Sequence, residues 1–347
     1  MEPEHLKSIP VSIIGGSGYT GGELIRLISG HPNFKLIQIV ANRSAGKKVE
    51  DVFPHLRHLK LSAFINFQEL DFSKAKLIFC ALPHATSHEI LKKIPPGIKI
   101  IDLSADFRLS DPTEYENWYK TEHIAKDLQQ HAVYGLSEFY REEIEKAKII
   151  ACTGCNAAAS LLPLLPLLKR KIIDISQVTI SLGAGVSGAG RVAKENIIHS
   201  EVSEGTKPYN VGTHRHLAEL NQEFSKVQTK KIDVTLIPHL LPQNRGIIVS
   251  IPLDYNANSI HEALNDYYRS ESFVIILPIG NIPATHHVRG SNYCHIGVVQ
   301  DNNSERCILF SAIDNLVKGS SGQAIQNANI SFGLDETAGL RDSPIFP

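Results

Sequence analysis

The sequence feature that most constrains the fold is a glycine-rich loop near the N-terminus. Residues 9–14 form a short apolar segment typical of a buried strand, and they run directly into Gly15-Gly-Ser-Gly-Tyr-Thr-Gly21. Residues 23–28 follow with helical spacing of apolar positions. Glycines between a strand and a helix let the chain turn tightly and let a pyrophosphate approach the helix N-terminus. This context predicts a dinucleotide-binding loop and not a plain turn.

The rest of the N-terminal half continues the alternation of strands and helices. Apolar segments at residues 34–40, 76–82 and 98–103 are interpreted as buried strands, with a helical stretch between the last two. Alternation of this kind is typical of a parallel sheet with helices on both faces. We therefore expect an α/β domain here.

The C-terminal half has a different pattern of expected strands and helices. Segments rich in β-branched residues predict a mixed or antiparallel sheet carrying a few helices, with a hairpin loop at residues 300–305 and a last long helix that follows Gly319-Ser-Ser-Gly322 and runs to about Ile330. The expected strands are residues 178–182, 233–237, 246–252, 273–277, 292–299 and 306–312.

Composition limits the class of partner. The 347 residues are enough for two domains, and 35 basic against 36 acidic side chains leave a net charge of −1. Such a balance argues against nucleic acid or an anionic membrane as the partner and favours a small molecule. The five scattered cysteines do not form a disulfide framework, and no secretory signal is visible, so we expect a cytoplasmic protein. Residues 149–168 are interpreted as a buried strand, turn and helix, and not as a membrane span.

The segment after the second expected strand indicates which nucleotide is bound. An NAD-binding protein usually offers an acidic residue there to hold the ribose 2′-hydroxyl. This chain has Asn42-Arg43-Ser44 instead, and Arg43 with Ser44 can hold a 2′-phosphate. The pattern therefore favours NADP, the alternative being that Arg43 is a solvated loop charge.

Cys155 is the candidate nucleophile. It follows a short apolar strand and a glycine turn, and it precedes a helical stretch that begins at the cysteine. A helix N-terminus stabilises a thiolate, which is the attacking form of cysteine. Cys80, in the middle of an expected strand, is interpreted as a buried structural thiol.

Histidines and arginines supply the other candidate groups. Thr213-His214-Arg215-His216 lies just before a helical segment, and a thiol enzyme needs an acid/base group that titrates near neutrality. His84 and His88 have metal-like spacing but no third ligand in the pattern, so we expect no metal site. Arg108 and Arg191 offer guanidinium groups for a substrate bearing phosphate and carboxylate.

Taken together, these motifs resemble the N-acetyl-γ-glutamyl-phosphate reductase family, and the match covers nearly the whole chain. The landmarks are Gly15-Gly-Ser-Gly-Tyr-Thr-Gly-Gly-Glu-Leu24, Asn42-Arg-Ser-Ala-Gly-Lys47, Leu82-Pro-His-Ala-Thr-Ser87, Asp102-Leu-Ser-Ala-Asp-Phe-Arg108, Tyr134-Gly-Leu136, Gly154-Cys155, Ser187-Gly-Ala-Gly-Arg191, His214-Arg-His216, Ala312-Ile-Asp-Asn-Leu-Val-Lys-Gly319 and Gly333-Leu-Asp-Glu-Thr-Ala-Gly-Leu340.

The resemblance implies two domains and a homo-oligomer, either a dimer or a tetramer. Residues 1–153 and 319–347 would form an NADP-binding Rossmann domain completed by the C-terminal helix. Residues 154–318 would form an α+β catalytic and oligomerisation domain of the kind found in aspartate-semialdehyde dehydrogenase.

It also implies the chemistry and the residues that carry it. The expected reaction is the NADPH-dependent reduction of N-acetyl-γ-glutamyl phosphate to N-acetylglutamate semialdehyde and phosphate through a cysteine thioester, a step of arginine biosynthesis. Cys155 is the expected nucleophile and His214 the expected acid/base. The expected cofactor-binding residues are Gly15, Ser17, Gly18, Tyr19, Thr20, Gly21, Arg43, Ser44, Pro83 and Gly188, and the expected substrate-binding residues are Arg108, Ser187 and Arg191.

The chain departs from the family pattern around the nucleophile. The family usually reads Asn-Pro-Gly-Cys-Tyr-Pro-Thr, whereas this chain reads Cys152-Thr-Gly-Cys155-Asn156-Ala-Ala. The Gly-Cys-Asn-Ala form is also similar to reductases of aminoadipyl or glutamyl phosphate held on an acidic carrier protein. The absence of a basic excess favours the free N-acetyl substrate.

Two other protein classes share part of this pattern. A dinucleotide-binding redox sensor, with Cys152 and Cys155 as its switch, is the non-enzymatic alternative. A short-chain dehydrogenase requires Tyr-x-x-x-Lys, which the chain lacks.

Overall fold

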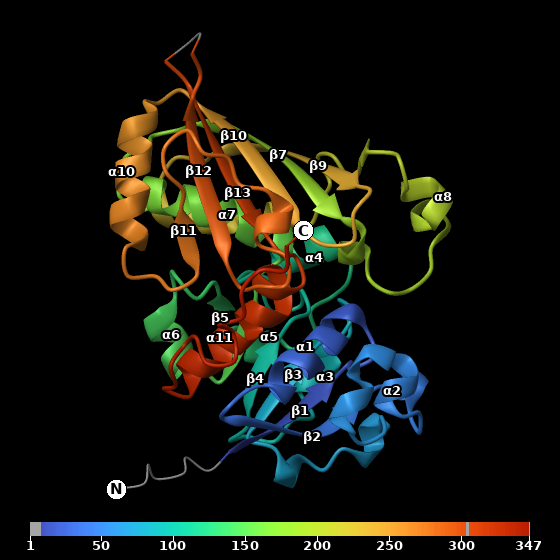
Figure 1. Cartoon of the computed structure of the whole chain (residues 1–347). Helices are drawn as coiled ribbons and strands as arrows, with labels where there is room; N and C mark the ends of the chain where they lie inside the picture. Colours follow the sequence, from blue (N-terminus) through green and yellow to red (C-terminus); the bar gives the residue numbers. More distant parts are fainter. Residues whose placement is uncertain (1–7, 303–304, 347) are drawn as a thin grey trace, which may run out of the picture. The chain divides into compact units, whose positions relative to one another are not determined.

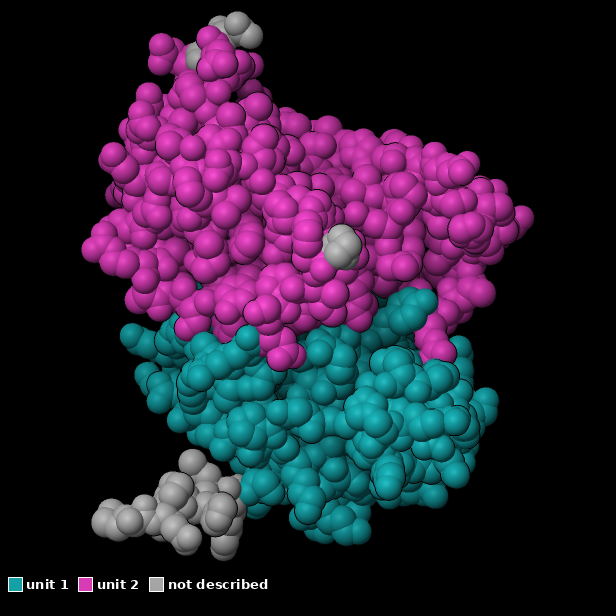
Figure 2. Space-filling view, viewed as in Figure 1, with its two compact units in different colours: residues 1–153, 320–341 teal, residues 154–319, 342–347 magenta. Residues whose placement is uncertain are grey.

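The structure is a computed structural model that describes residues 8–302 and 305–346 (Figure 1). The chain divides into two compact units (Figure 2). Unit 1 is Met1–Thr153 with Ser320–Arg341, and unit 2 is Gly154–Gly319 with Asp342–Pro347.

Unit 1 is built on a six-stranded parallel sheet with the strand order β2-β1-β3-β4-β6-β5. The expected parallel α/β architecture is confirmed, and β5 is a strand that the sequence analysis did not predict. The strands are β1 (Ile9–Ile14), β2 (Phe34–Val40), β3 (Leu77–Cys80), β4 (Lys99–Asp102), β5 (Ala132–Gly135) and β6 (Ile149–Cys152).

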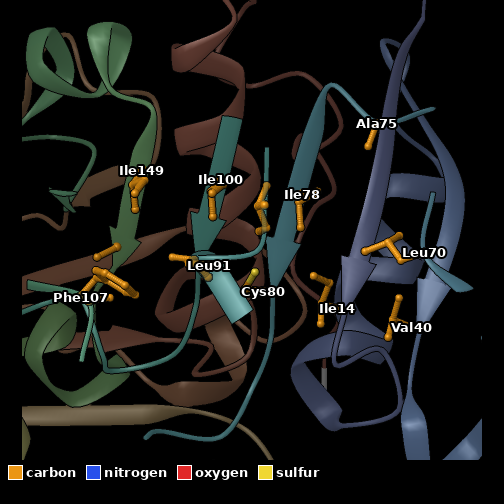
Figure 3. Packing of buried hydrophobic residues seen from close by; sticks show 13 residues of the cluster. Ile14, Val40, Leu70, Ala75, Ile78, Cys80, Leu91, Ile100, Phe107 and Ile149 are labelled. Atoms are coloured by element: carbon orange, nitrogen blue, oxygen red, sulfur yellow. The ribbon is translucent and has the colours of Figure 1, made fainter. Parts of the chain in front are cut away.

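Alternate strand residues of this sheet point to the same face and build its core. Ile14, Ile78, Ile100 and Ile149 come from four neighbouring strands and belong to one buried cluster (Figure 3). The cluster also contains Leu91, which comes from α3 (Ser87–Leu91). The remaining α-helices of unit 1 are α1 (Tyr19–Ser29), α2 (Val49–Val52), α4 (Pro112–Tyr119), α5 (Lys126–Gln129), α6 (Arg141–Lys146) and α11 (Gly322–Ser331).

Helix α11 is the expected last long helix, and it packs on α1, α6 and strands β4, β5 and β6. All of its residues are buried although many are polar, so its amides need hydrogen-bond partners. Asn327 Nδ2 donates to the carbonyl oxygen of Gly135 at 2.9 Å, and Gln323 Oε1 accepts from the Thr153 hydroxyl at 2.8 Å. These bonds tie the helix to the ends of β5 and β6.

Unit 2 is built on a seven-stranded mixed sheet with the order β11-β12-β13-β10-β7-β9-β8. Strands β12 and β13 pair antiparallel, which confirms the hairpin, while β7–β9 and β11–β12 are parallel pairs. The strands are β7 (Gln177–Gly185), β8 (Lys207–Pro208), β9 (Asp233–Leu241), β10 (Ile247–Leu253), β11 (Val274–Ile276), β12 (Cys294–Gln300) and β13 (Cys307–Ile313).

The central helix of unit 2 is α7 (Cys155–Lys169), which contains Pro163 and Pro166. A proline inside a helix leaves the carbonyl four residues earlier without its N–H partner. Here the hydroxyl of Ser311 donates to the freed carbonyl of Ala159, and that of Tyr268 donates to the freed carbonyl of Leu162. The helix therefore continues through both prolines.

Helix α7 packs against strands β7, β10 and β13 and against two other helices. These are α9 (His216–Val227) and α10 (Ala257–Tyr268), and the short α8 (His199–Val202) is the remaining α-helix of the unit. Strand β6 followed by α7 confirms the strand, turn and helix expected for residues 149–168. Across residues 8–302 and 305–346, no helix is both long and apolar enough to cross a membrane.

Candidate active site

Of Gly15, Gly18 and Gly21 in the loop between β1 and α1, two are tightly packed and one is open. Gly15 has φ +89°, and a side chain there would overlap the carbonyl oxygen of Ala81. A Cβ at Gly21 would lie 2.6 Å from the backbone of Gly15 and Gly16. Gly18, in contrast, has no heavy atom within 4 Å of the position a Cβ would take. Gly15 and Gly21 thus shape the loop, while Gly18 leaves room beside it.

The open position coincides with the start of α1. Gly18 is the N-cap of the helix, and the first turn carries no acidic side chain. The first N–H groups of a helix have no intrahelical partner, and together with the helix dipole they attract an anion. Ser17 precedes the cap, and Tyr19 and Thr20 are the first helical residues. The loop therefore fits the pyrophosphate of a dinucleotide.

Arg43 and Ser44 lie at the carboxyl end of the neighbouring strand. They belong to a 3₁₀ turn, Asn42–Ser44, which follows β2, and β2 pairs with β1. The Asn42 side chain accepts a hydrogen bond of 3.0 Å from the backbone N–H of Phe67, which holds the turn in place. The Arg43 side chain is exposed, so it can meet a phosphate group at this edge.

Pro83 lies in the loop that follows β3, and a buried carboxylate holds this loop. The Asp106 side chain accepts hydrogen bonds from the backbone N–H groups of Ala85, Thr86 and Ser87, at 2.7, 3.0 and 2.9 Å. The Tyr115 hydroxyl donates to the same carboxylate at 2.8 Å. These hydrogen bonds therefore join two sequence motifs, Leu82-Pro-His-Ala-Thr-Ser87 and the segment from Asp102 to Arg108.

Arg108 lies at the end of that segment and contacts the backbone. Its Nε donates to the carbonyl oxygen of Cys152 at 2.7 Å, and its Nη2 donates to that of Leu103 at 3.2 Å. Arg108, the expected substrate-binding arginine, thus holds the end of β6 through a hydrogen bond.

Cys155 is the first residue of α7, directly after the N-cap Gly154. The backbone N–H of Gly154 donates to the Glu219 carboxylate at 2.9 Å. A side chain at residue 154 would overlap the ring of His216, and one at Gly319 would place its Cβ 2.8 Å from the Cβ of Cys155. Two glycines therefore allow close packing around the cysteine.

The Cys155 side chain belongs to a polar cluster in unit 2. Its Sγ lies 3.8 Å from Oδ1 of Asn156. The Asn156 Nδ2 lies 3.2 Å from the hydroxyl oxygen of Tyr209 and 3.3 Å from Nε2 of His214. The structure therefore brings the predicted pair, Cys155 and His214, to the same asparagine.

The two histidines of the pair have different surroundings. Burial, and to a smaller extent the positive charge of Arg215, lower the pKa of His214 to about 4, so its imidazole is neutral at pH 7. Its Nδ1 accepts a hydrogen bond of 3.1 Å from the backbone N–H of His216. The Nε2 of His216 lies 3.9 Å from a Glu219 carboxylate oxygen, a partner suited to an imidazole that gains a proton.

The remaining predicted residues lie on a turn of unit 2. Ser187 and Gly188 belong to the 3₁₀ helix Val186–Ala189 that follows β7, and Asn315 Nδ2 donates to the Ser187 hydroxyl at 2.9 Å. Arg191 follows this turn and is exposed.

Sequence reasoning missed several residues of these clusters. Asn156 appeared only as a departure from a family pattern, although it immediately follows the nucleophile. Glu219 stands three residues after His216, the spacing that places two side chains on the same side of a helix. Tyr209 gave no usable signal and Asp106 appeared only inside the landmark of residues 102–108, because only the fold brings these two residues to their partners. Among residues 8–302 and 305–346, no group of three His, Cys, Asp or Glu side chains could hold a metal ion.

Comparison with known families gives a match for each half of the chain. Residues 10–147 match the family described as semialdehyde dehydrogenase, NAD binding domain. Residues 155–315 match the one described as semialdehyde dehydrogenase, dimerisation domain.

Relatives match over nearly the full length. Proteins from Cereibacter sphaeroides and Jannaschia sp., each named N-acetyl-gamma-glutamyl-phosphate reductase, are 51% identical over 97% of this chain and 99% of their own. Among solved structures, aspartate semialdehyde dehydrogenase II from Vibrio cholerae is similar, with a TM-score of 0.70 at 17% identity over 94% of this chain and 99% of that one. The Candida albicans aspartate semialdehyde dehydrogenase with NADP gives a TM-score of 0.65 at 16% identity, covering 93% and 98% of the two chains. At these identities the solved structures show the fold alone.

Proposed function

Because the chain belongs to the semialdehyde dehydrogenase family, and within it to the N-acetyl-γ-glutamyl-phosphate reductases, we propose that it reduces N-acetyl-γ-glutamyl phosphate with NADPH. The products are N-acetylglutamate semialdehyde, NADP⁺ and phosphate, as required for arginine biosynthesis. The observation that carries this proposal is the position of Cys155 at the first residue of α7, within the Asn156 and His214 cluster.

The mechanism that we propose is covalent. The Cys155 thiolate attacks the γ-carbonyl carbon, a carbon–sulfur bond forms, the carbon–oxygen bond to phosphate breaks, and a thioester remains. Bound NADPH would supply the hydride that reduces this thioester. The resulting tetrahedral oxyanion then collapses, so that the carbon–sulfur bond breaks, the aldehyde leaves and the thiolate is regenerated. Backbone N–H groups at the start of α7 are placed to stabilise negative charge on the oxygen.

An acid/base group must take the proton from the Cys155 thiol before it attacks. For this step we propose a histidine of the 214–216 pair. The sequence analysis assigned this role to His214, and that assignment stays a prediction. His216 is the second candidate, because Glu219 lies beside its ring whereas Nδ1 of His214 already accepts a hydrogen bond. Single His214→Asn and His216→Asn variants separate the two, since loss of a positioned acid/base slows turnover by roughly a hundredfold or more.

For the cofactor we propose NADPH, with the pyrophosphate at the loop of Gly15, Gly18 and Gly21 and the 2′-phosphate at Arg43 and Ser44. The exposed guanidinium of Arg43 at the carboxyl end of β2 supports this choice. Ser17, Tyr19 and Thr20 line the same helix N-terminus, and we propose Pro83 and Gly188 as further cofactor contacts. A helix N-terminus binds anions in general, whereas Arg43 would bind only the 2′-phosphate, which NADH lacks.

We also propose which residues bind the substrate and which unit forms the contacts between subunits. Ser187 and Arg191 recognise the carboxylate and phosphate groups of the substrate, and Arg108, whose expected role in substrate binding stays a prediction, holds the carbonyl oxygens of Cys152 and Leu103. Unit 2, which matches the dimerisation domain, forms the contacts of a homo-oligomer. The five free cysteines suit a reducing cytoplasm, where the nucleophile stays available.

The experiment that tests the proposed function measures NADPH oxidation by the purified protein with two substrates. We expect turnover with free N-acetyl-γ-glutamyl phosphate and none with glutamyl or aminoadipyl phosphate attached to a carrier protein. Turnover with the carrier-bound form alone would assign the chain to the carrier-dependent reductases. Nucleotide binding without turnover of either substrate would support the redox-sensor alternative.

A further inference from the structure

Asn156 connects the candidate nucleophile to two other polar side chains of unit 2. The residue is 2% exposed, and one end of its amide faces Sγ of Cys155 at 3.8 Å. The other end faces the Tyr209 hydroxyl oxygen at 3.2 Å and Nε2 of His214 at 3.3 Å. A buried amide with one acceptor end and one donor end must match the proton positions of its neighbours on both sides.

The proton position on His214 follows from its other nitrogen. The backbone N–H of His216, which can only donate, points at Nδ1 of His214 at 3.1 Å, so Nδ1 carries no proton. A neutral imidazole then carries its single proton on Nε2 and donates from there. Burial lowers the pKa of His214 to about 4, which keeps the ring neutral at pH 7. The end of Asn156 that faces Nε2 must therefore be an acceptor.

Tyr209 places a second donor at the same end of the amide. Burial raises the pKa of the Tyr209 phenol to about 12, so the hydroxyl keeps its proton and can donate. A carbonyl oxygen has two lone pairs and can accept from both Tyr209 and His214, whereas an amide nitrogen cannot accept from either. A half-turn of the amide exchanges its oxygen and nitrogen and satisfies both donors.

We propose that Asn156 acts in catalysis by donating a hydrogen bond from Nδ2 to the Cys155 thiolate, with its Oδ1 held by Nε2–H of His214 and the hydroxyl of Tyr209. This inference deepens the proposed function and rests on it, since it assumes that Cys155 reacts as a thiolate. Asn156 is the catalytic residue of this arrangement because it touches the reacting sulfur. Tyr209 and His214 are positioning residues that fix which end of the amide meets the sulfur. In this arrangement both ring nitrogens of His214 are engaged, so the acid/base role falls to His216.

Charged groups of both signs lie near Cys155. The Glu219 carboxylate accepts the N–H of Gly154, so a negative charge lies next to the residue that precedes Cys155. The positive charge of Arg215, the residue that follows His214, contributes to the lowered pKa of His214. A charge-assisted N–H donor to sulfur, together with the start of α7, offsets the effect of the nearby carboxylate.

The test is the pH dependence of Cys155 alkylation by iodoacetamide, which requires no substrate. The proteins are the wild type, Asn156→Ala, Asn156→Leu and Tyr209→Phe, and the alkylation rate of Cys155→Ser is subtracted as the contribution of the other cysteines. NADPH binding and the thermal melt identify variants that retain the fold. Alanine admits water beside the sulfur and leucine excludes it, so together they separate loss of the donor from a change in solvation.

We expect both Asn156 variants to raise the midpoint of alkylation by about one pH unit, which slows alkylation about tenfold below the midpoint. Tyr209→Phe should give a smaller shift in the same direction. If Oδ1 instead faces the sulfur, it stabilises the thiol, and Asn156→Ala lowers the midpoint. A lowered or unchanged midpoint in Asn156→Ala overturns the proposal, even if Asn156→Leu raises it.

A second measurement uses the wild-type protein, so it does not depend on the folding of any variant. Nitrogen and carbon chemical shifts of the His214 ring report which nitrogen carries the proton. We expect the Nε2–H form, and the Nδ1–H form would overturn the proposal. Neither result depends on the substrate, so a chain that failed to reduce acyl phosphates could still show this arrangement, and an active enzyme could still lack it.

Discussion

Nε of Arg108 donates a hydrogen bond of 2.7 Å to the carbonyl oxygen of Cys152, the last residue of β6. Nη2 of the same guanidinium donates to the carbonyl oxygen of Leu103, so one side chain joins the ends of two chain segments of unit 1. Cys155 follows three residues after Cys152 in the sequence. Arg108 therefore holds the backbone from which the chain continues to the nucleophile.

We predict that Arg108→Lys lowers kcat by about tenfold or more and changes KM little, because a lysine ammonium cannot reproduce the divergent donors of a guanidinium. Steady-state kinetics with the acyl phosphate provides the measurement. Arg141→Lys, which alters a surface ion pair with Glu336, is the control and should leave both constants unchanged. An increase in KM with kcat retained would show instead that Arg108 binds the substrate.

We predict that alanine at two glycines of the loop affects two different properties. Gly15→Ala should lower the melting temperature, since residue 15 has φ +89° and its side chain would overlap the carbonyl oxygen of Ala81. Gly18→Ala should leave the melting temperature nearly unchanged and weaken NADPH binding, because its methyl group enters the open space beside the helix N-terminus. Thermal melts and NADPH titrations separate the two outcomes. Intact NADPH binding by a stable Gly18→Ala protein would rule out the pyrophosphate position proposed here.

We predict that Arg43→Ala weakens NADPH binding about tenfold or more and leaves NADH binding nearly unchanged, since NADPH alone has a 2′-phosphate that can pair with the guanidinium. Equilibrium titration of both nucleotides checks this result. Lys35→Ala removes an exposed charge of β2, away from the turn of Arg43, and serves as the control. Equal weakening of both nucleotides by Arg43→Ala would make Arg43 a general loop charge.

We predict that His214 makes the stability of the protein sensitive to acid. Its folded-state pKa of about 4 lies below the ordinary value of 6.5, so between these two pH values the unfolded chain binds a proton that the folded chain excludes. The free energy of unfolding therefore falls as the pH decreases through this window, by at most about 3 kcal/mol from this residue. Denaturant melts of the wild type and His214→Gln at several pH values measure the difference. Parallel losses in the two proteins would contradict the prediction.

The sequence was most informative where the local pattern determines the local structure. The glycine loop, the helix that starts at Cys155 and the β12–β13 hairpin are each specified by neighbouring residues, and the structure confirms all three. Strand β5 was missed because its sequence, Ala132-Val-Tyr-Gly135, is poorer in large aliphatic residues than those of the other strands of its sheet and lies among short helices. Its pairing with β6 and its contact with Asn327 of α11 are tertiary and leave no local signature.

In the candidate site, too, local motifs were predicted and contacts between distant segments were not. Cys155 and His214 were predicted from motifs, and the structure brings both to Asn156. The sequence could not reveal that Arg108 donates to the backbone of Cys152 or that Asp106 holds the loop of Pro83, because each bond joins segments that are distant along the chain. Patterns of residue types thus predicted which groups matter, and only the fold showed what those groups contact.

The central claim is that Cys155 carries the substrate as a thioester. The most direct measurement compares wild type and Cys155→Ser in NADPH oxidation with N-acetyl-γ-glutamyl phosphate, after NADPH titration has shown that both proteins bind the cofactor. The account predicts that the variant binds NADPH as the wild type does and shows no detectable turnover, because the serine hydroxyl cannot replace the thiolate in this step. Turnover by the variant above a few per cent of the wild-type rate would contradict the covalent mechanism.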